Sequence, residues 1–203
     1  MIPNYSYLKR ERYNSSPAFI LKRTSFGETS FIVEAYSLKW GKISFIAKGI
    51  RNSKSKNLGI INNLNEVRLD LYKKKENNLH ILKDIDLAKN YISEFDYSSK
   101  LLAYAAAELY RKIYVLDEDF SKFYDLIRKF LESLHKYSKN RVILFWRFIF
   151  RIFNYLGISP ILDRCTACHS KENSYLAYSI IENGIVCSQC HENTAQEIEK
   201  KKD

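Results

Sequence analysis

The sequence contains few of the residues that most often interrupt or cross-link a chain. Among 203 residues there are six glycines, three prolines, four cysteines and one methionine. So little glycine and proline excludes a collagen-like or low-complexity chain. A hydrophobic content of 46% with 28% charged residues is ordinary for a globular protein. The length therefore allows a substantial core within one large or two small domains.

Long apolar runs and catalytic motifs are also missing. No run of eighteen apolar residues occurs, and the nearest one, at 142–150, is interrupted by Arg147, which argues against a membrane span. There is no Gly-rich phosphate loop, HExxH or GxSxG motif, and the four histidines are scattered. The first residues lack the apolar core and the small-residue cleavage site of a signal peptide. We therefore expect a cytoplasmic, non-catalytic protein.

Acidic residues are absent from one strongly basic stretch. The formal net charge is +10, and residues 1–88 hold 16 Lys or Arg against 8 Asp or Glu. Residues 39–56 include six basic residues and no acid. With two cations from the preceding strand, the candidate DNA-binding residues are Lys22, Arg23, Lys39, Lys42, Lys48, Arg51, Lys54 and Lys56. Such a face would neutralise phosphates without reading base sequence, whereas the alternative is a solvated lysine-rich loop.

Short β-prone segments fill the first half of the chain. They lie at 19–23, 31–37, 43–48, 66–73 and 79–86, with turn signals between them. Five strands without a long intervening helix favour a small closed barrel such as an OB-fold, although an SH3-like barrel would give a similar pattern. Tyr36, Trp40 and Phe45 are candidates for stacking on bases. For Phe45 we favour a place in the core, and for Trp40 packing at the turn.

The pattern becomes helical from residue 98 onward. Apolar residues recur every three or four positions from Leu101 to Ile113, again from Phe120 to Leu134, and across 142–156. The third run is so rich in aromatic residues that we expect it to be the central helix, ending at Gly157. The predicted fold class is α+β. Its parts are an N-terminal five-stranded barrel (1–88), a helical domain (89–160) and a metal-binding module (161–203).

All four cysteines form two CxxC pairs near the end of the sequence. Cys165 and Cys168 are separated from Cys187 and Cys190 by eighteen residues. That spacing is typical of a tetrathiolate zinc site, in which each pair binds the metal from one tight turn. Four thiolates leave no open coordination position, so one Zn²⁺ ion would fold the segment rather than catalyse a reaction.

Other interpretations of the cysteines remain open. Each pair is followed by a histidine, His169 or His191, so both halves also match the CxxCH pattern of c-type haem attachment. A disulfide pair, a redox CxxC or an iron site would fit the same residues. The histidines are possible substitute ligands, although we expect them to point to solvent. Zinc is the interpretation that we favour.

Two stretches combine distinctive motifs. The first is residues 18–33, with their Gly-Glu turn, followed by the Gly-Lys-Ile-Ser hairpin after Trp40. The second is residues 148–168, where a helix ending in Leu-Gly-Ile-Ser-Pro leads into the first CxxC. In order and spacing, over most of the chain, these motifs resemble zinc-bearing members of the RecO family of bacterial recombination mediators.

The resemblance implies an OB-fold, a helical domain and a zinc module, in that order. It also implies binding of single- and double-stranded DNA, annealing of complementary strands, and cooperation with RecR and single-strand-binding protein to help RecA replace the latter. Lys48 and residues 51–56 correspond to the family's DNA-contacting region, and the four cysteines to its zinc ligands. The main rival hypothesis is a zinc-ribbon transcription or RNA-binding factor. A redox or haem protein, and a hydrolase whose acid-base residues converge only in the fold, are the others.

Overall fold

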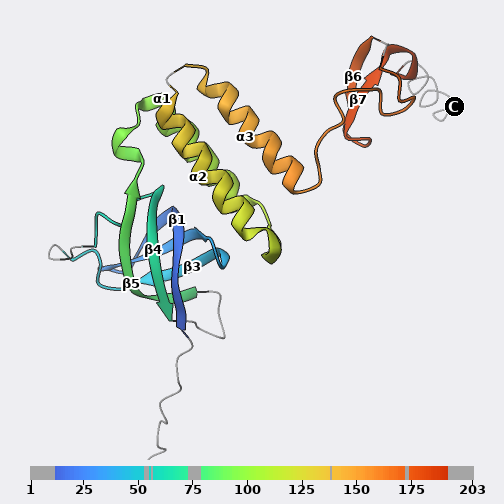
Figure 1. Ribbon diagram of the computed structural model, residues 1–203. Helices are drawn as coiled ribbons and strands as arrows, with labels where there is room; N and C mark the ends of the chain where they lie inside the picture. The colour runs from blue at the N-terminus through green and yellow to red at the C-terminus, as the bar shows by residue number, and fades with distance from the viewer. Residues whose placement is uncertain are drawn as a thin grey trace, which may run out of the picture. The chain divides into compact units, whose positions relative to one another are not determined.

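The computed structural model describes residues 12–52, 55, 57–72, 79–137, 139–171 and 174–191 (Figure 1). The chain divides into two compact units, Met1–Phe148 and Ile149–Asp203. The first unit contains a barrel and two helices, and the second contains a small hairpin. The division into three domains at 88 and 160 remains a prediction.

Five strands form a closed barrel, as the sequence predicts. They are β1 (Arg12–Phe26), β2 (Ser30–Ser37), β3 (Gly41–Ala47), β4 (Asn65–Tyr72) and β5 (Leu79–Asn90). Their order around the barrel is β1-β2-β3-β5-β4, and only the β3–β5 pair is parallel. The apolar residues of β4, Val67, Leu69 and Leu71, are fully buried because alternate side chains of a strand point to the inside of the barrel. This architecture confirms the OB-like barrel.

Strand β1 is much longer than the predicted segment 19–23. The first half of β1 contains polar residues and Pro17, so its sequence does not have the pattern of a strand. In the structure, the hydroxyls of Ser16 and Ser37 are 2.8 Å apart and form a buried hydrogen bond between β1 and β2. Pro17 pairs with Arg68 of β4, and its carbonyl accepts a hydrogen bond from the Leu38 N–H at 2.9 Å. Tertiary pairing therefore supplies the partners that make this polar stretch a strand.

Three helices follow the barrel: α1 (Tyr97–Lys112), α2 (Phe120–Lys136) and α3 (Arg141–Tyr155). The Asp96 side chain caps α1 by accepting from the Ser99 N–H at 2.9 Å. Gly157, with a φ of +70°, follows α3 in the left-handed conformation that glycine adopts readily, and this confirms the predicted end. No helix in the described part of the chain is both long and apolar enough to cross a membrane.

Two expectations about the helical faces are wrong. Leu101 was expected on the buried face of α1, but it is 59% exposed, and the small residues Ala103, Ala106 and Ala107 are buried instead. Helix α3 was expected to be central, yet its Trp146 is 55% exposed. Helix α2 has the most buried residues of the three: Phe123, Tyr124, Leu126, Ile127, Phe130, Leu131 and Leu134. Hydrophobicity marks a helix for burial but does not select its partner.

A carboxylate joins the barrel to the helices. Glu66 of β4 accepts hydrogen bonds from the hydroxyls of Tyr124, at 2.6 Å, and Tyr91, at 3.2 Å. Burial, followed by interaction with Glu66, raises the pKa of both phenols, so they remain donors at neutral pH. The rings of Phe19 and Tyr124 lie 5.1 Å apart across the same junction. These contacts fix α2 against β1 and β4.

A second group of contacts ties the C-terminal end of α1 to the barrel. Arg111 makes two hydrogen bonds to Glu34 of β2, at 2.8 and 3.1 Å. The hydrogen bond to Glu34 is the main reason why the pKa of Arg111 is raised. Lys42 of β3 donates to the carbonyls of Arg111 and Ile113, at 3.0 and 3.2 Å. A cation at a helix C-terminus pairs with carbonyls that have no partner within the helix.

Substitution of Gly41 tests the packing of the barrel against Phe120, the first residue of α2. Gly41 has a φ of +60°, and a Cβ atom there would overlap the ring of Phe120. Gly27 is the matched control, because its φ is +58° and a Cβ would meet nothing within 4 Å. Both alanine variants carry a left-handed penalty of about 1–2 kcal/mol, but Gly41→Ala should lose about 1–3 kcal/mol more in the free energy of unfolding. Urea denaturation measures the difference, and equal losses would contradict this packing.

Candidate nucleic-acid interface and metal centre

Two arginines lie close to one aromatic ring at the end of the barrel that carries the β1–β2 turn. The guanidinium carbons of Arg23 and Arg51 are 5.1 and 5.7 Å from the centroid of the Phe31 ring. The Arg23 guanidinium donates to the Ile61 carbonyl at 2.9 Å, and that of Arg51 to the Gly27 carbonyl at 3.0 Å. The ring and the carbonyls thus orient both cations.

Lys48 belongs to the same end of the barrel. Phe31 pairs with Ala47 across β2 and β3, so the exposed Lys48 follows directly beyond the paired residues. The backbone N–H of Arg51 donates to the Thr29 carbonyl at 2.9 Å, which holds the segment after β3 against the turn. We call Arg23, Lys48 and Arg51 the basic end of the barrel.

Lys39 and Lys42 lie at the opposite end of strand β3. Lys42 and Lys48 are separated by about 20 Å along that strand, at roughly 3.3 Å per residue. The ammonium of Lys42 caps α1, and that of Lys39 donates to the Ser15 carbonyl at 3.2 Å. The structure therefore separates these two residues from the basic end.

The remaining predicted cations have varied positions. Lys22 is exposed on β1, opposite Glu34 of β2. Lys54 and Lys56 lie outside the described residues. The eight cations were predicted to share one face. Instead, three of the described ones form the basic end, Lys39 and Lys42 lie apart from it, and Lys22 lies on β1 between these two groups.

The three aromatic candidates for base stacking are packed within the protein. Phe45 is fully buried and Trp40 packs against the barrel core, both as favoured from the sequence. Tyr36 is only 1% exposed and packs edge-on against Tyr110 at 5.1 Å, so it has no face for a base. The contact of Phe31 with two arginines was not predicted, because its position in a strand is equally consistent with an ordinary core residue.

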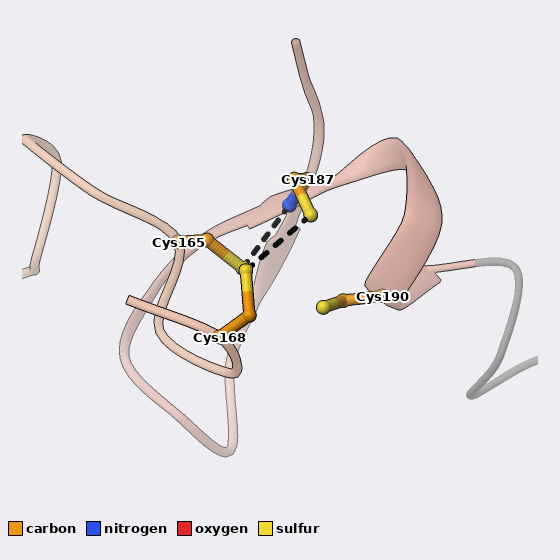
Figure 2. Close-up of side chains that lie close together, drawn as sticks. All are labelled: Cys165, Cys168, Cys187 and Cys190. Atoms are coloured by element: carbon orange, nitrogen blue, oxygen red, sulfur yellow. Dashed lines mark hydrogen bonds between the residues drawn. The ribbon is translucent and has the colours of Figure 1, made fainter. Parts of the chain in front are cut away.

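The four cysteines come together in the C-terminal unit. Their sulfur atoms all lie within 4.8 Å of one another, and the sulfurs of Cys168 and Cys187 are 3.8 Å apart (Figure 2). Bonds of about 2.3 Å in a tetrahedron place sulfurs about 3.8 Å apart, so the spacing fits a tetrathiolate metal site. The cluster of Cys165, Cys168, Cys187 and Cys190 could therefore hold a metal ion.

A small hairpin positions the two pairs. Strands β6 (Tyr175–Ser179) and β7 (Gly184–Cys187) are antiparallel, and β7 ends at Cys187. The turn of the first pair is held against β7, because the Thr166 N–H donates to the Ile185 carbonyl at 2.9 Å. A Cβ atom at Gly184 would lie 2.6 Å from the Ile161 carbonyl oxygen, so this close approach requires glycine.

Backbone dipoles favour a thiolate at the first cysteine. Hydrogen bonds from the backbone of Cys168, and then of Cys187, lower the pKa of the Cys165 thiol to about 6. The Cys187 N–H lies 3.4 Å from this sulfur. Hydrogen bonding to Cys187 and then Cys168 raises the pKa of Cys190 to about 12. A divalent cation at the centre would offset the repulsion that keeps four neighbouring thiols from ionising together.

The adjacent histidines lie outside the cluster. His169 and His191 are exposed, as expected, and the metal-binding group found among the described residues contains cysteines alone. All four cysteines are free rather than joined in disulfides. His169 has a φ of +59° and its N–H donates to the Cys165 carbonyl at 2.9 Å, so its backbone closes the first turn.

Substituting one cysteine should abolish metal binding. Cys187 is fully buried, and its replacement by serine removes one of four thiolates. The Cys187→Ser variant should lose the bound ion, while His191→Ala retains one ion per chain. Elemental analysis after dialysis measures both. Equal loss of metal from the histidine variant would show that the ligand set includes His191.

Two families of known proteins match the chain in succession. "Recombination protein O N terminal" matches residues 12–91, and "Recombination protein O C terminal" matches residues 94–201. The boundary between the two matches follows β5 and precedes α1. The first match covers the barrel, and the second covers the helices and the cysteines.

Curated relatives give the same result. The chain is 26% identical to "DNA repair protein RecO" of Caldanaerobacter subterraneus subsp. tengcongensis, over 89% of this chain and 72% of the relative. It is 30% identical to the proteins of that name from Prosthecochloris aestuarii, over 72% of this chain and 56% of the relative, and Pelodictyon phaeoclathratiforme, over 73% and 57%. It thus spans little more than half the length of the latter two. From these matches and the barrel, the chain belongs to the RecO family of DNA repair proteins.

Proposed function

We propose that the protein is a recombination mediator that binds single- and double-stranded DNA and anneals complementary strands. In this proposal it acts with RecR and single-strand-binding protein to help RecA replace the latter on DNA. Family membership supports the role. The observation that carries the DNA-binding part is the basic end of the barrel, where Arg23 and Arg51 are oriented around Phe31 and Lys48 is exposed beside them.

The proposed reaction needs no covalent step. Two complementary strands repel each other through their phosphates, and each bound cation releases counterions and lowers that repulsion. Base pairing then supplies both the specificity and the driving force. A surface that contacts phosphates without reading bases suits this task, because it must accept any sequence.

Among the eight predicted cations, the structure favours some over others. Arg23 and Arg51 lie near the same ring, and the exposed Lys48 directly follows β3 at that end of the barrel. Lys54 and Lys56 follow Arg51 in the sequence. The Lys42 ammonium is engaged by the end of α1, so we assign it to the fold rather than to DNA. Lys22 and Lys39 would extend the surface away from the basic end.

We further propose that the cysteine cluster binds one Zn²⁺ ion with a structural role. Four cysteine sulfurs within 4.8 Å of one another are a donor set that zinc prefers, and a tetrathiolate site has no open position for a substrate. The ion would connect the turn at Cys165 to strand β7. Metal binding would then contribute to the folding of the C-terminal unit, since its four cysteines are not joined by disulfides.

Charge removal at the basic end should weaken binding to unrelated sequences equally. For single strands, each lost phosphate contact lowers the slope of log affinity against log salt by roughly 0.7. The double variant Lys48→Gln, Arg51→Gln should therefore lower that slope by about 1.4, and adding Lys54→Gln and Lys56→Gln should lower it further. Fluorescence anisotropy at several salt concentrations measures the slope.

The matched control removes the same charge elsewhere. Lys112 and Lys129 are exposed cations on α1 and α2. Neither belongs to the strands or turns that form the basic end of the barrel. Lys112→Gln, Lys129→Gln should keep most of the salt slope. If both double variants bind like the unsubstituted protein, the basic end is not the DNA site.

Annealing tests the mediator role directly. Two complementary strands are coated with single-strand-binding protein, and their pairing is followed by fluorescence quenching with and without this protein. We expect faster pairing in its presence, and little acceleration with Lys48→Gln, Arg51→Gln. DNA binding without faster pairing would leave a DNA-binding barrel and contradict the mediator role.

A further inference from the structure

A polar cavity of about 450 Å³ lies where strand β5 leads into α1. Its walls come from β1, from the loop before β4, from the end of β5 with the 3-10 turn Ile92–Glu94, and from α1. Its volume falls within the range of about 300–1,000 Å³ typical of small-ligand pockets. All of these elements belong to the first compact unit.

Two cations line this cavity without a neutralising acid. They are Arg23 from β1 and Lys100 from α1, and none of the described lining residues is acidic. Neither residue forms an ion pair with a carboxylate in the part of the chain that the structure describes. The bond from Arg23 to the Ile61 carbonyl fixes one guanidinium arm, which leaves a preoriented positive charge at the wall. A phosphate group is the ligand that such a pair suits.

The remaining polar lining offers amides and a hydroxyl. These residues are Asn62, Asn63, Asn90 and Ser93. The side-chain oxygen of Asn63 is buried and has no hydrogen-bond partner among the described residues. Buried polar groups are usually hydrogen-bonded, so an unpaired buried acceptor in a lining residue is unusual.

An aromatic ring completes the cavity. Tyr104 of α1 lines it and is 44% exposed, one turn along the helix from Lys100. An accessible tyrosine beside paired cations is the combination that single-stranded nucleic acid uses, with the phosphate on the charges and the base stacked on the ring. A base held in a duplex cannot reach such a ring without being unpaired.

We propose that this cavity binds one nucleotide of a single DNA strand. The phosphate lies between Arg23 and Lys100, and the base stacks on Tyr104. The inference rests on the proposed DNA-binding function and adds to it a base-holding site outside the basic end. Arg23 links the two regions, because its guanidinium lies over Phe31 and the same residue lines the cavity. A strand bound at the basic end can thus continue into the cavity.

The site makes a base-dependent contact that the basic end does not make. Phosphate contacts alone hold a strand whether or not it carries bases, whereas stacking requires a base. The protein should therefore prefer an ordinary single strand to an abasic strand of equal length. Tyr104 should account for that preference.

The test compares three DNA probes of equal length: an ordinary single strand, an abasic single strand and a duplex. Tyr104→Ala should weaken binding to the ordinary strand roughly five- to hundredfold, because one stacked base contributes about that much affinity. Binding to the abasic strand and to the duplex should be unchanged. Tyr104→Phe keeps the ring and should restore the affinity. Tyr114→Ala is the control, since Tyr114 is 80% exposed and is not in the lining.

Lys100→Gln tests the phosphate part of the site. It should weaken both single strands alike and lower their salt slope by about 0.7. Normal binding of all three probes by Tyr104→Ala and Lys100→Gln would overturn the nucleotide site but leave the proposed function intact. A protein that binds none of the probes would contradict the proposed function, and the nucleotide site with it. Thermal unfolding of each variant confirms that it remains folded.

Discussion

Parallel pairing of β3 with β5 closes the barrel, and the burial of the barrel core depends on that closure. Residues Ser44, Phe45 and Ile46 pair with Leu79, His80 and Ile81, and this ladder joins two strands that are far apart in sequence. Without it the sheet would have two free edges, and its core residues would face water. The antiparallel pairing of β2 with both β1 and β3 then places the turn after β1 beside the segment after β3. Arg23 and Arg51 therefore lie near the same ring, that of Phe31.

The barrel uses some of its cations for folding and offers others to solvent. Lys42 and Arg111 are both committed to the junction with α1, through helix carbonyls and through Glu34. Arg23 and Arg51 use one hydrogen bond each to a backbone carbonyl, and this orients the guanidinium without neutralising its charge. A carboxylate partner would offset the charge that attracts phosphates, whereas a carbonyl does not. The distinction between structural and ligand-binding cations therefore rests on their partners.

The metal centre depends on local structure more than the basic end of the barrel does. Each CxxC turn brings two sulfurs together over four residues, and the hairpin of β6 and β7 returns the chain to the first turn. Gly184 permits the close approach of Ile161 and Thr166 that aligns the pairs. Contacts over a short stretch of chain thus assemble all four ligands, and this is why their spacing in sequence is so informative.

The sequence alone determined the elements that depend on short-range patterns. Alternation in 66–73 predicted β4, Gly157 predicted the end of α3, and the two CxxC pairs predicted the sulfur cluster, because each signal lies within a few residues or one hairpin. The tertiary structure decided what depends on distant partners. It made the polar start of β1 a strand, left Trp146 exposed and committed the Lys42 ammonium to the end of α1. It also brought Arg23, Lys100 and Tyr104 to one cavity, because only folding joins residues from a strand and a helix far along the chain.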